Sequence, residues 1–463
     1  MTSNDDKKSP QANSSKNGGF LWGAATSSHQ VEGYNDKNDW WQFEAEGRVD
    51  NGERSGAATD HWNRFREDLA LAADLGLNSY RFSIEWSRVE PEEGRWDDLA
   101  FEWYEQLIAE CEKRGLMPML TLHHFTSPQW LARQGGWTAP GAALKFTRFA
   151  GEVARRLGAR VPLWCTLNEP MVLATGTYLL KTMPPGVFAP ELCSRMSAEL
   201  LRAHVMTYDL LHSRLPERKG PWKDRPVEVG IAHNMLDFMP ERGWHPIERL
   251  IASVLERFYN RSWLDAVTGR KQHFGILGLV PYARQVQEAR GRRTVDFLGI
   301  NYYTKACIQW QPESKSPDAK IDVPLGVVFS LDGEPSSDMG WAVHPEGFSR
   351  ILKDAGRYGL PVYVTENGIA DKDDRIRPDY LLSHLAEIAH LVEQGLDLRG
   401  YYHWSLLDNF EWIKGFGPRF GLFQVDYKTF ERKPTQTAIL LKKILQRHRV
   451  QGADTPRRDL IQS

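Results

Sequence analysis

The chain has 463 residues, of which 41% are hydrophobic and 25% charged, a composition typical of a globular protein that buries a sizeable core. Its 58 basic and 60 acidic side chains give a formal net charge of -2, which excludes the strongly basic surface that binding to nucleic acid or to an anionic membrane requires. The four cysteines show no Cys-x-x-Cys spacing, which predicts reduced thiols in a cytoplasmic protein and neither a zinc site nor a disulfide framework.

Both ends of the chain are polar. Residues 1–18 lack the apolar core of a secretory signal, and we expect a disordered tail there. Residues 448–463 are expected to form a polar C-terminal tail. Residues 19–447 contain no Pro/Ser/Gly-rich linker and no apolar run of about 18 residues or more, so they are predicted to form one domain that does not span a membrane.

Eight short apolar runs recur along this domain. Several are almost continuously apolar, as expected of parallel strands that are buried on both faces. They are residues 19–26, 78–84, 116–122, 161–167, 227–233, 295–301, 360–366 and 398–404.

Amphipathic segments lie between these runs. In residues 60–76, Phe65 and Leu69 fall at helical spacing and Gly76 supplies a stop, and residues 141–158 show a similar pattern. Strand and helix alternating in this way predict a closed parallel barrel.

The predicted fold is therefore a single (β/α)8 TIM barrel with helical and loop insertions. The insertions are expected in the two longest connections, residues 234–294 and 302–359, the first of which contains a further helical pattern in residues 245–269.

Polar side chains cluster just after the apolar part of several runs. In a parallel barrel the carboxyl ends of all strands face the same way, so we expect these side chains to line one pocket. They are Gln30, Arg81, Glu85, His123, His124, Asn168, Glu169, Asn301, Tyr303, Glu366, Asn367 and Trp404.

Two of these acids close their strands in similar surroundings, Glu169 in TLNEP and Glu366 in VTENG. Proline disfavours the helical region for the residue before it, which predicts that Glu169 lies at an extended strand tip. A pair of carboxyl groups across a glycosidic bond is the usual means of hydrolysing it, since one protonates the leaving oxygen while the other attacks or activates water. The pair indicates a glycosidase, and direct displacement needs the carboxyl groups about 5 to 5.5 Å apart.

Each of these residues, taken alone, could have a purely structural role. A glutamate at a strand end is more often an ion-pair partner or a helix cap than a catalyst, His124 could be a core histidine, and Arg81 could bridge the barrel floor. The expected position of all these residues at one pole of the barrel favours a functional site.

TLNEP and VTENG occur in order with SSHQVEG, YRFSIEWSR, LGINYYT, DMGWAVHPEG and WSLLDNFEW. From about Phe20 to Lys443 the sequence closely resembles the family-1 glycoside hydrolases. The resemblance implies a retaining exo-β-glycosidase, foremost a β-glucosidase, that removes terminal β-D-glucosyl residues from small β-glucosides or oligosaccharides through a covalent glycosyl-enzyme. Galactosyl and fucosyl residues are further possible glycones.

Carried over residue by residue, the resemblance implies that Glu169 is the acid/base and Glu366 the nucleophile. Arg81, Asn301 and Tyr303 would form the shell around the nucleophile. The sugar-binding side chains would be Gln30, His124, Asn168, Trp404, Glu411 and Trp412, with Trp341 as an aglycone platform.

The chain departs from the family at one wall of the sugar site. Where many members have Tyr-His-Trp-Asp, this sequence has His123, His124, Phe125 and Thr126. The departure leaves the sugar preference open, and the individual character of the connecting loops leaves the aglycone open.

Two other functions fit the sequence less well. A 6-phospho-β-glycosidase is disfavoured by Glu411 and Trp412, because a carboxylate repels a phosphate. A non-catalytic sugar-binding barrel is disfavoured because both Glu169 and Glu366 are present. No metal or other cofactor is expected, since the carboxyl pair supplies acid, base and nucleophile and the histidines lack a His-Glu-x-x-His spacing. The sequence gives no oligomeric state.

Overall fold

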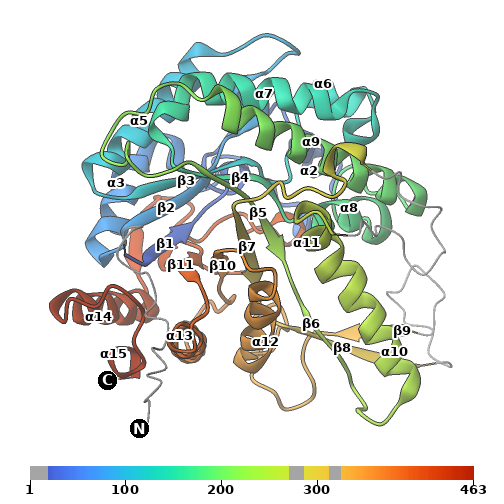
Figure 1. The fold of residues 1–463 in the computed structure, drawn as a ribbon, viewed down its shortest axis with the longest axis vertical. Helices are drawn as coiled ribbons and strands as arrows, with labels where there is room; N and C mark the ends of the chain where they lie inside the picture. Colours follow the sequence, from blue (N-terminus) through green and yellow to red (C-terminus); the bar gives the residue numbers. More distant parts are fainter. Residues whose placement is uncertain (1–18, 271–285, 312–324, 463) are drawn as a thin grey trace, which may run out of the picture.

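The eight apolar runs form the eight strands of a closed barrel in the computed structural model, which describes residues 19–270, 286–311 and 325–462 (Figure 1). The strand order is β1-β11-β10-β7-β5-β4-β3-β2, and every neighbouring pair is parallel. This confirms the predicted eightfold barrel. The barrel strands are β1 Leu21–Ala25, β2 Ser79–Ser83, β3 Met117–His123, β4 Leu163–Asn168, β5 Glu228–Asn234, β7 Phe297–Tyr302, β10 Val362–Asn367 and β11 Leu398–Trp404.

The inside of the barrel is filled by side chains that alternate along the strands. Leu21, Met119, Phe297 and Tyr402 are buried there in one cluster. Gly23 is required beside them, because a Cβ at this position would lie 2.3 Å from the ring of Tyr402. The barrel is therefore a packed core, and a substrate can be held only at one of its ends.

Helices surround the barrel (Figure 1). The α-helices are α1 Ser28–Val31, α2 Asp39–Ala45, α3 His61–Leu75, α4 Trp86–Val89, α5 Asp98–Lys113, α6 Gln129–Arg133, α7 Ala142–Leu157, α8 Pro170–Thr175, α9 Pro190–Arg214, α10 Pro246–Leu255, α11 Ser262–Val267, α12 Pro345–Gly356, α13 Arg377–Glu393, α14 Gln436–Val450 and α15 Arg458–Gln462. Shorter 3-10 and π segments are η1 Asp50–Gly52, η2 Gly136–Thr138, η3 Gly158–Arg160, η4 Gly176–Leu180, η5 Glu256–Arg261, η6 Gln287–Ala289 and η7 Trp412–Lys414.

The two helices expected from their apolar spacing are confirmed as α3 and α7. Phe65 and Leu69 of α3 are buried, and the helix ends at Gly76, whose φ of 93° is one that glycine adopts at little cost. The helical pattern of residues 245–269 forms α10, η5 and α11. Burial of one apolar stripe explains why α3 and α7 are helical, whereas α10 packs against β6 and β8 and buries only Glu248 and Ala252.

The long connections also contain strands that the sequence did not predict. β6 Asp237–Pro240 pairs in parallel with β8 Lys305–Trp310, which pairs antiparallel with β9 Leu325–Val328. β12 Phe423–Val425 and β13 Arg432–Pro434 form a second small sheet. The insertions are thus partly β-structure.

The C-terminal segment packs against the domain instead of extending from it as a polar tail. The boundary expected at residue 447 falls within α14, and Leu460 and Ile461 of α15 are 7% and 1% exposed. The N–H of Phe20 donates to the carbonyl of Asp454 at 2.9 Å. The tail expected at residues 1–18 lies outside the described residues.

No helix in the described ranges is long and apolar enough to cross a membrane.

Candidate active site

The two predicted carboxylates lie at the carboxyl ends of strands in the same pole of the barrel. Glu366 is on β10, and Glu169 follows the last residue of β4. Glu169 is not at an extended strand tip as expected: its φ of 46° and ψ of 59° are left-handed, and it caps the start of α8 before Pro170. Proline disfavours the right-handed region there, and the hydrogen bond from the Glu169 N–H to the carbonyl of Ala232, 2.7 Å long, helps to hold the left-handed conformation.

Glu366 is 3% exposed and accepts two short hydrogen bonds. Arg81 donates from Nη1 to Oε1 at 2.5 Å, and Tyr303 donates from its hydroxyl to Oε2 at 2.6 Å. Both interactions favour the ionised carboxylate, one by opposite charge and the other by a hydrogen bond to the charged form. Glu366 is thus buried between a guanidinium and a hydroxyl donor.

Two asparagines connect this group to Glu169. Asn301 donates from Nδ2 to Glu169 Oε1 at 2.7 Å and to Asn168 Oδ1 at 3.2 Å. Asn168 Oδ1 also accepts from Arg81 Nη2 at 2.7 Å. One continuous hydrogen-bond network therefore joins both glutamates, although they are distant in sequence.

The two acids have opposite electrostatic environments. Burial, and then the charge of Glu366, raise the pKa of Glu169 to about 8. Burial lowers the pKa of Arg81, but the attraction of Glu366 outweighs it and the net pKa is raised. Burial and the charge of Glu366 raise the pKa of Tyr303 well above its ordinary value. At neutral pH Glu169 therefore carries a proton. Arg81 remains cationic.

A polar corner lies beside the pair. Gln30 donates from Nε2 to Asn409 Oδ1 at 2.9 Å, to the Phe410 carbonyl at 2.9 Å and to Glu411 Oε2 at 3.4 Å. Burial and the charge of Glu366 raise the pKa of Glu411 to about 8. These amide and carboxyl groups can bind hydroxyl groups of a polar ligand.

Aromatic rings adjoin this corner, because Trp412 follows Glu411. His124 stacks on Trp404 with ring centroids 5.7 Å apart and on Trp412 with centroids 6.1 Å apart. Burial lowers the pKa of His124 well below its ordinary value, so its imidazole is neutral and can bind a hydroxyl group. Asn168 Nδ2 lies 3.1 Å from its Nε2. Trp341 is tilted against Tyr303, with centroids 5.6 Å apart.

The structure thus brings together most of the residues that the sequence had placed at one pole. Three of them have other partners: Glu85 accepts from Ser87 and Thr126, His123 lies against Ser127 and Trp137, and Asn367 donates to the Tyr302 carbonyl and the Tyr380 hydroxyl.

The structure also adds three residues that were not singled out for the site. Thr365 donates to Asn301 Oδ1 at 2.6 Å, Asn409 accepts from Gln30, and the ring of His29 stacks on Trp412 with centroids 5.8 Å apart. All three lie within the motifs VTENG, WSLLDNFEW and SSHQVEG, so their place in these motifs was the sequence signal that could have identified them.

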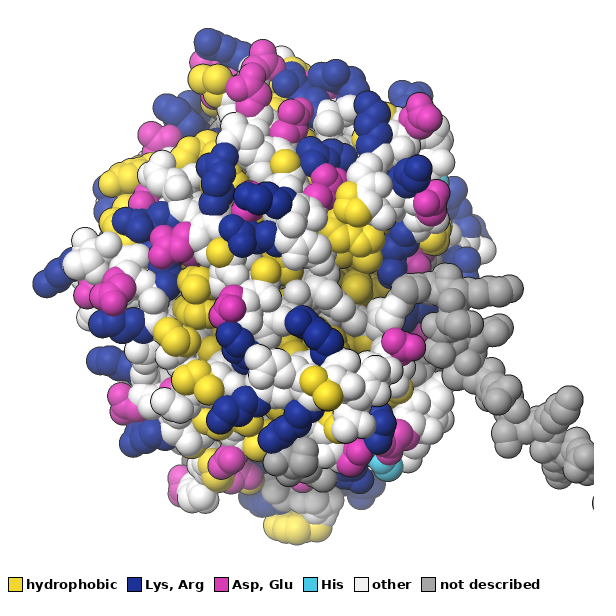
Figure 2. All heavy atoms as spheres, turned by 90° about the vertical axis from the view of Figure 1, so that its left-hand side faces the viewer, with side chains coloured by type: hydrophobic (Ala, Val, Ile, Leu, Met, Phe, Trp, Pro, Cys, Tyr) yellow, Lys and Arg dark blue, Asp and Glu magenta, His cyan; other side chains and the backbone are white. Residues whose placement is uncertain are grey.

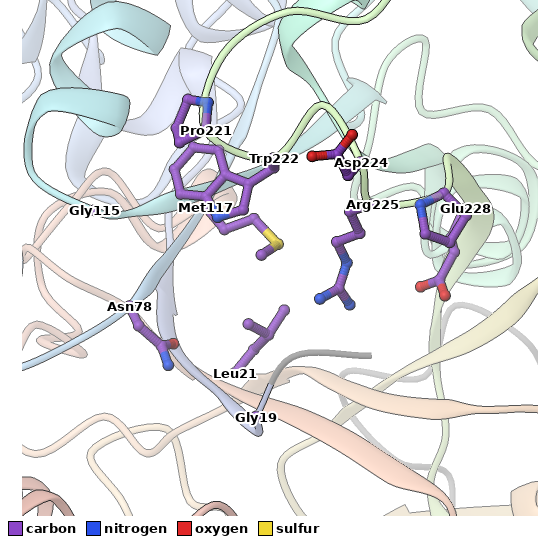
Figure 3. Close-up of a pocket in the computed structure, with 11 residues that line it drawn as sticks. Gly19, Leu21, Asn78, Gly115, Met117, Pro221, Trp222, Asp224, Arg225 and Glu228 are labelled. Carbon is purple, nitrogen blue, oxygen red and sulfur yellow. The ribbon is translucent and has the colours of Figure 1, made fainter. Parts of the chain in front are cut away.

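A hollow of about 410 Å³ at the other pole is a different feature (Figure 3). Leu21, Met117 and Glu228, which line it, are at the amino ends of β1, β3 and β5. Trp222 and Arg225 come from the connection between α9 and β5, and Figure 3 shows both side chains beside the hollow. Since neither Glu169 nor Glu366 lines it, this hollow in the barrel floor is not the candidate active site.

A sequence model described as glycosyl hydrolase family 1 matches residues 13–450. The chain belongs to this family. It is 32% identical to β-glucosidase A of Thermotoga maritima, over 89% of this chain and 94% of that protein. It is 29% identical to a β-galactosidase of Pyrococcus woesei, over 91% and 94% of the two chains.

Solved structures show the same relationship. A β-glycosidase from Pyrococcus horikoshii superposes with a TM-score of 0.80 at 37% identity and covers 96% of both chains. A β-glucosidase from Thermotoga maritima in complex with glucoimidazole superposes with a TM-score of 0.82 at 31% identity, over 92% of this chain and 98% of that one. The family and the barrel fold expected from the sequence are both confirmed.

Proposed function

We propose that this enzyme is a retaining exo-β-glucosidase that hydrolyses terminal β-D-glucosyl residues of small β-glucosides and short β-glucans such as those from cellulose. The observation that carries the proposal is the network in which Arg81, Asn168 and Asn301 join Glu169 to Glu366 at the barrel mouth. The relatives named β-glucosidase and the sugar-like ligand in one of them support it.

In the first step Glu366 acts as nucleophile. Its carboxylate attacks the anomeric carbon while the carboxyl group of Glu169 gives its proton to the glycosidic oxygen, so that the alcohol departs. A bond forms between carbon and the Glu366 oxygen as the bond to the leaving oxygen breaks. Arg81 and Tyr303 hold the nucleophile in place before the attack.

In the second step Glu169 acts as base. The ester at Glu366 carries no charge, so the repulsion that raised the pKa of Glu169 is removed and its proton is held less tightly. The carboxylate of Glu169 takes a proton from water, whose oxygen attacks the anomeric carbon and releases Glu366. Two inversions leave the product with the β configuration of the substrate.

Gln30, His124, Glu411 and Trp412 are proposed to bind the hydroxyl groups of the sugar, and Asn168 the 2-hydroxyl. Trp404 is proposed as the platform below the sugar and Trp341 as the platform for the aglycone. Their amide, imidazole, carboxyl and indole groups around one corner support these assignments. Some hydrolysis of β-galactosides and β-fucosides is included in the proposal.

The stereochemistry tests the mechanism directly. NMR should show the β-anomer of the sugar first, and an α-anomer formed first would contradict retention. Glu366→Gly should be inactive, and azide should restore turnover with an α-glycosyl azide as product. A β-azide would instead identify Glu366 as the acid/base.

The proposal includes a cytoplasmic location. The four cysteines, Cys111, Cys165, Cys193 and Cys307, are buried and free as thiols, which suits a reducing compartment. Fractionation of source cells checks this, and activity confined to the medium would contradict it.

A further inference from the structure

The side-chain amide of Asn301, on β7, has two ends that would affect Glu169 in opposite ways. Its nitrogen donates hydrogen bonds and its oxygen accepts them. A donor supports the ionised carboxylate of Glu169, whereas an acceptor would support the protonated form. Asn301 Nδ2 lies 2.7 Å from Glu169 Oε1, so the donor end faces the acid. The orientation of this amide therefore affects how readily Glu169 releases its proton.

The neighbours of Asn301 determine this orientation. A guanidinium can only donate, so the atom of Asn168 that lies 2.7 Å from Arg81 Nη2 must be the acceptor Oδ1. The Asn301 atom that lies 3.2 Å from that oxygen must then be the donor Nδ2. Asn301 Oδ1 is left to face the hydroxyl of Thr365, which donates to it at 2.6 Å. Among the described residues, no other group donates to this oxygen.

An irregularity in the strand pairing brings Thr365 to this position. β7 and β10 are neighbours in the barrel (Figure 1). Val364 of β10 lies opposite Ile300 of β7, but Glu366 lies opposite Asn301, so Thr365 is one residue more than the pairing needs. A bulge of this kind changes the direction of the side chains beside it. Both Thr365 and Glu366 can thereby reach groups of the active site.

A glycine on the neighbouring strand leaves room for the side chain of Thr365. A Cβ at Gly299 of β7 would lie 2.7 Å from the methyl group of Thr365 and 3.0 Å from its hydroxyl. Thr365 is fully buried. Loss of its hydroxyl would therefore leave Asn301 Oδ1 buried without a partner, which is costly and gives the amide a reason to rotate.

We propose that Thr365 is a positioning residue for the acid/base, because its hydroxyl holds the amide of Asn301 with the donor end toward Glu169. Thr365 acts through Asn301 and does not hydrogen-bond to Glu169 itself. The residue next to the nucleophile thus influences the proton on the opposite carboxyl group. This inference rests on the proposed function, in which Glu169 is the acid/base.

The groups around Glu169 give the direction of the effect. The charged and titratable groups that face it are Glu366, Arg81, Glu411, Tyr259 and Tyr303. Burial, and then the charge of Glu366, raise the pKa of Glu169 to about 8, and the hydrogen bond from Asn301 is the strongest influence that lowers it. If Asn301 turns its oxygen toward Glu169 or moves away, this lowering is lost. The pKa of Glu169 should then rise.

Thr365→Val tests the proposal, because it keeps the shape of the side chain and removes the hydroxyl. The alkaline decline of kcat/KM for an alkyl β-glucoside, expected at about pH 8, should move upward by about half to one pH unit. Thr365→Ser keeps the hydroxyl and should restore the wild-type profile. Thr365→Ala also lacks the hydroxyl and replaces the valine variant if that variant does not fold.

Thr166→Val is the matched control. Thr166 is a buried threonine on β4, and its hydroxyl pairs with His204 Nδ1 at 2.6 Å and not with Asn301. This variant should leave the pH of the alkaline decline unchanged even if it lowers the stability of the fold.

Infrared difference spectra between acidic and alkaline pH give a second measurement that needs no substrate. The band of a protonated carboxyl group that is missing in Glu169→Gln belongs to Glu169. Its titration midpoint should move upward in Thr365→Val in the same way as the kinetic decline.

Three results would overturn the positioning role: no shift in Thr365→Val and Thr365→Ala, an equal shift in Thr166→Val, or a profile of Thr365→Ser that matches the valine variant. Failure of the proposed function has a different signature. An alkaline decline that persists in Glu169→Gln would show that Glu169 is not the acid, whereas the infrared band still reports whether Thr365 affects its proton.

Discussion

Two residues of the same type acquire different properties in this site because their neighbours differ. Glu366 accepts hydrogen bonds from Arg81 and the hydroxyl of Tyr303. Among the described residues, the side chain of Glu169 accepts one only from the amide of Asn301, and it faces the charge of Glu366. Burial and the charge of Glu366 raise the pKa of Glu169 to about 8, so Glu169 is protonated at neutral pH. The proposed roles of acid and nucleophile follow from this difference.

The proton on Glu169 predicts the alkaline side of the pH profile. Glu169 is active as an acid in its protonated form, so kcat/KM for an alkyl β-glucoside should fall as the pH rises through about 8. In Glu169→Gln this decline should be absent, and turnover should drop by about 10²- to 10⁴-fold.

A 2,4-dinitrophenyl glucoside serves as the control for this variant, because its leaving group needs no protonation and its first step should be much less affected. An alkyl glucoside that shows the same alkaline decline in wild type and Glu169→Gln would rule out Glu169 as the acid.

The hydroxyl of Tyr303 should matter for kcat. Tyr303→Phe removes a hydrogen bond to a charged group, which is worth about 1.5–3 kcal/mol, so kcat should fall about 10- to 100-fold with little change in KM. Tyr302→Phe is the control, since the Tyr302 hydroxyl donates to the carbonyl of His344 and not to Glu366. Equal losses of kcat in both variants would indicate a general structural effect.

Glu411 should reduce stability at alkaline pH. Its pKa in the folded protein is raised to about 8, so between its ordinary pKa and 8 the native state binds more protons than the unfolded state, and stability falls as the pH rises. Glu411→Gln should therefore raise the Tm, by about 1–2 °C above pH 8 and by less near pH 5. Calorimetry at both pH values measures this, and a larger gain at the acidic pH would contradict it.

At the scale of elements, the sequence was sufficient to predict a strand or helix where a single hydrophobic pattern dominates the segment. The barrel strands are short apolar runs, and α3 and α7 have one apolar stripe, so local pattern and burial agree. β6 and β9 are four residues long, and the side chains of β6 are only partly buried. Their pairing depends on contacts between distant segments, which no local pattern records.

The same distinction applies to the site. Residues in the recognised motifs could be predicted together, because the parallel barrel brings all strand ends to one pole. The left-handed backbone of Glu169 could not, since it depends on the carbonyl of Ala232 on the neighbouring strand.

The last helix provides a prediction at this scale. Ile461 is 1% exposed, and Ile461→Ala should cost about 2 kcal/mol locally, because a buried aliphatic group is removed. Since a terminal helix can detach by itself, hydrogen exchange of residues 451–462 should accelerate while kcat stays unchanged. Ile439→Ala on α14, where Ile439 is 38% exposed, is the control and should have little effect. Unchanged exchange in Ile461→Ala would show that α15 contributes nothing to stability.

At the scale of the whole molecule, the charge is balanced. Figure 2 shows Lys and Arg side chains interspersed with Asp and Glu over one face, and the formal net charge is -2. Such a surface produces little long-range attraction for a charged substrate, and what exists is screened by salt within about 10 Å at 0.1 M. The molecule as a whole is thus suited to a neutral substrate.

Because of this charge balance, we expect the enzyme to treat a plain β-glucoside and a 6-phosphoglucoside differently. For a neutral aryl β-glucoside, kcat/KM should change less than about twofold between about 0.05 and 0.5 M NaCl, because no net charge on the substrate is screened. The phosphorylated substrate should be turned over at least about a hundredfold more slowly, since its phosphate would lie near the charge of Glu366 and would have, among the described residues, no lysine or arginine beside Glu411 to pair with. In the described parts of the chain, Glu411 is paired with Gln30 and not with a lysine or arginine. Comparing the two substrates at both salt concentrations measures this, and faster turnover of the phosphorylated substrate would overturn the assignment of a plain β-glucosidase.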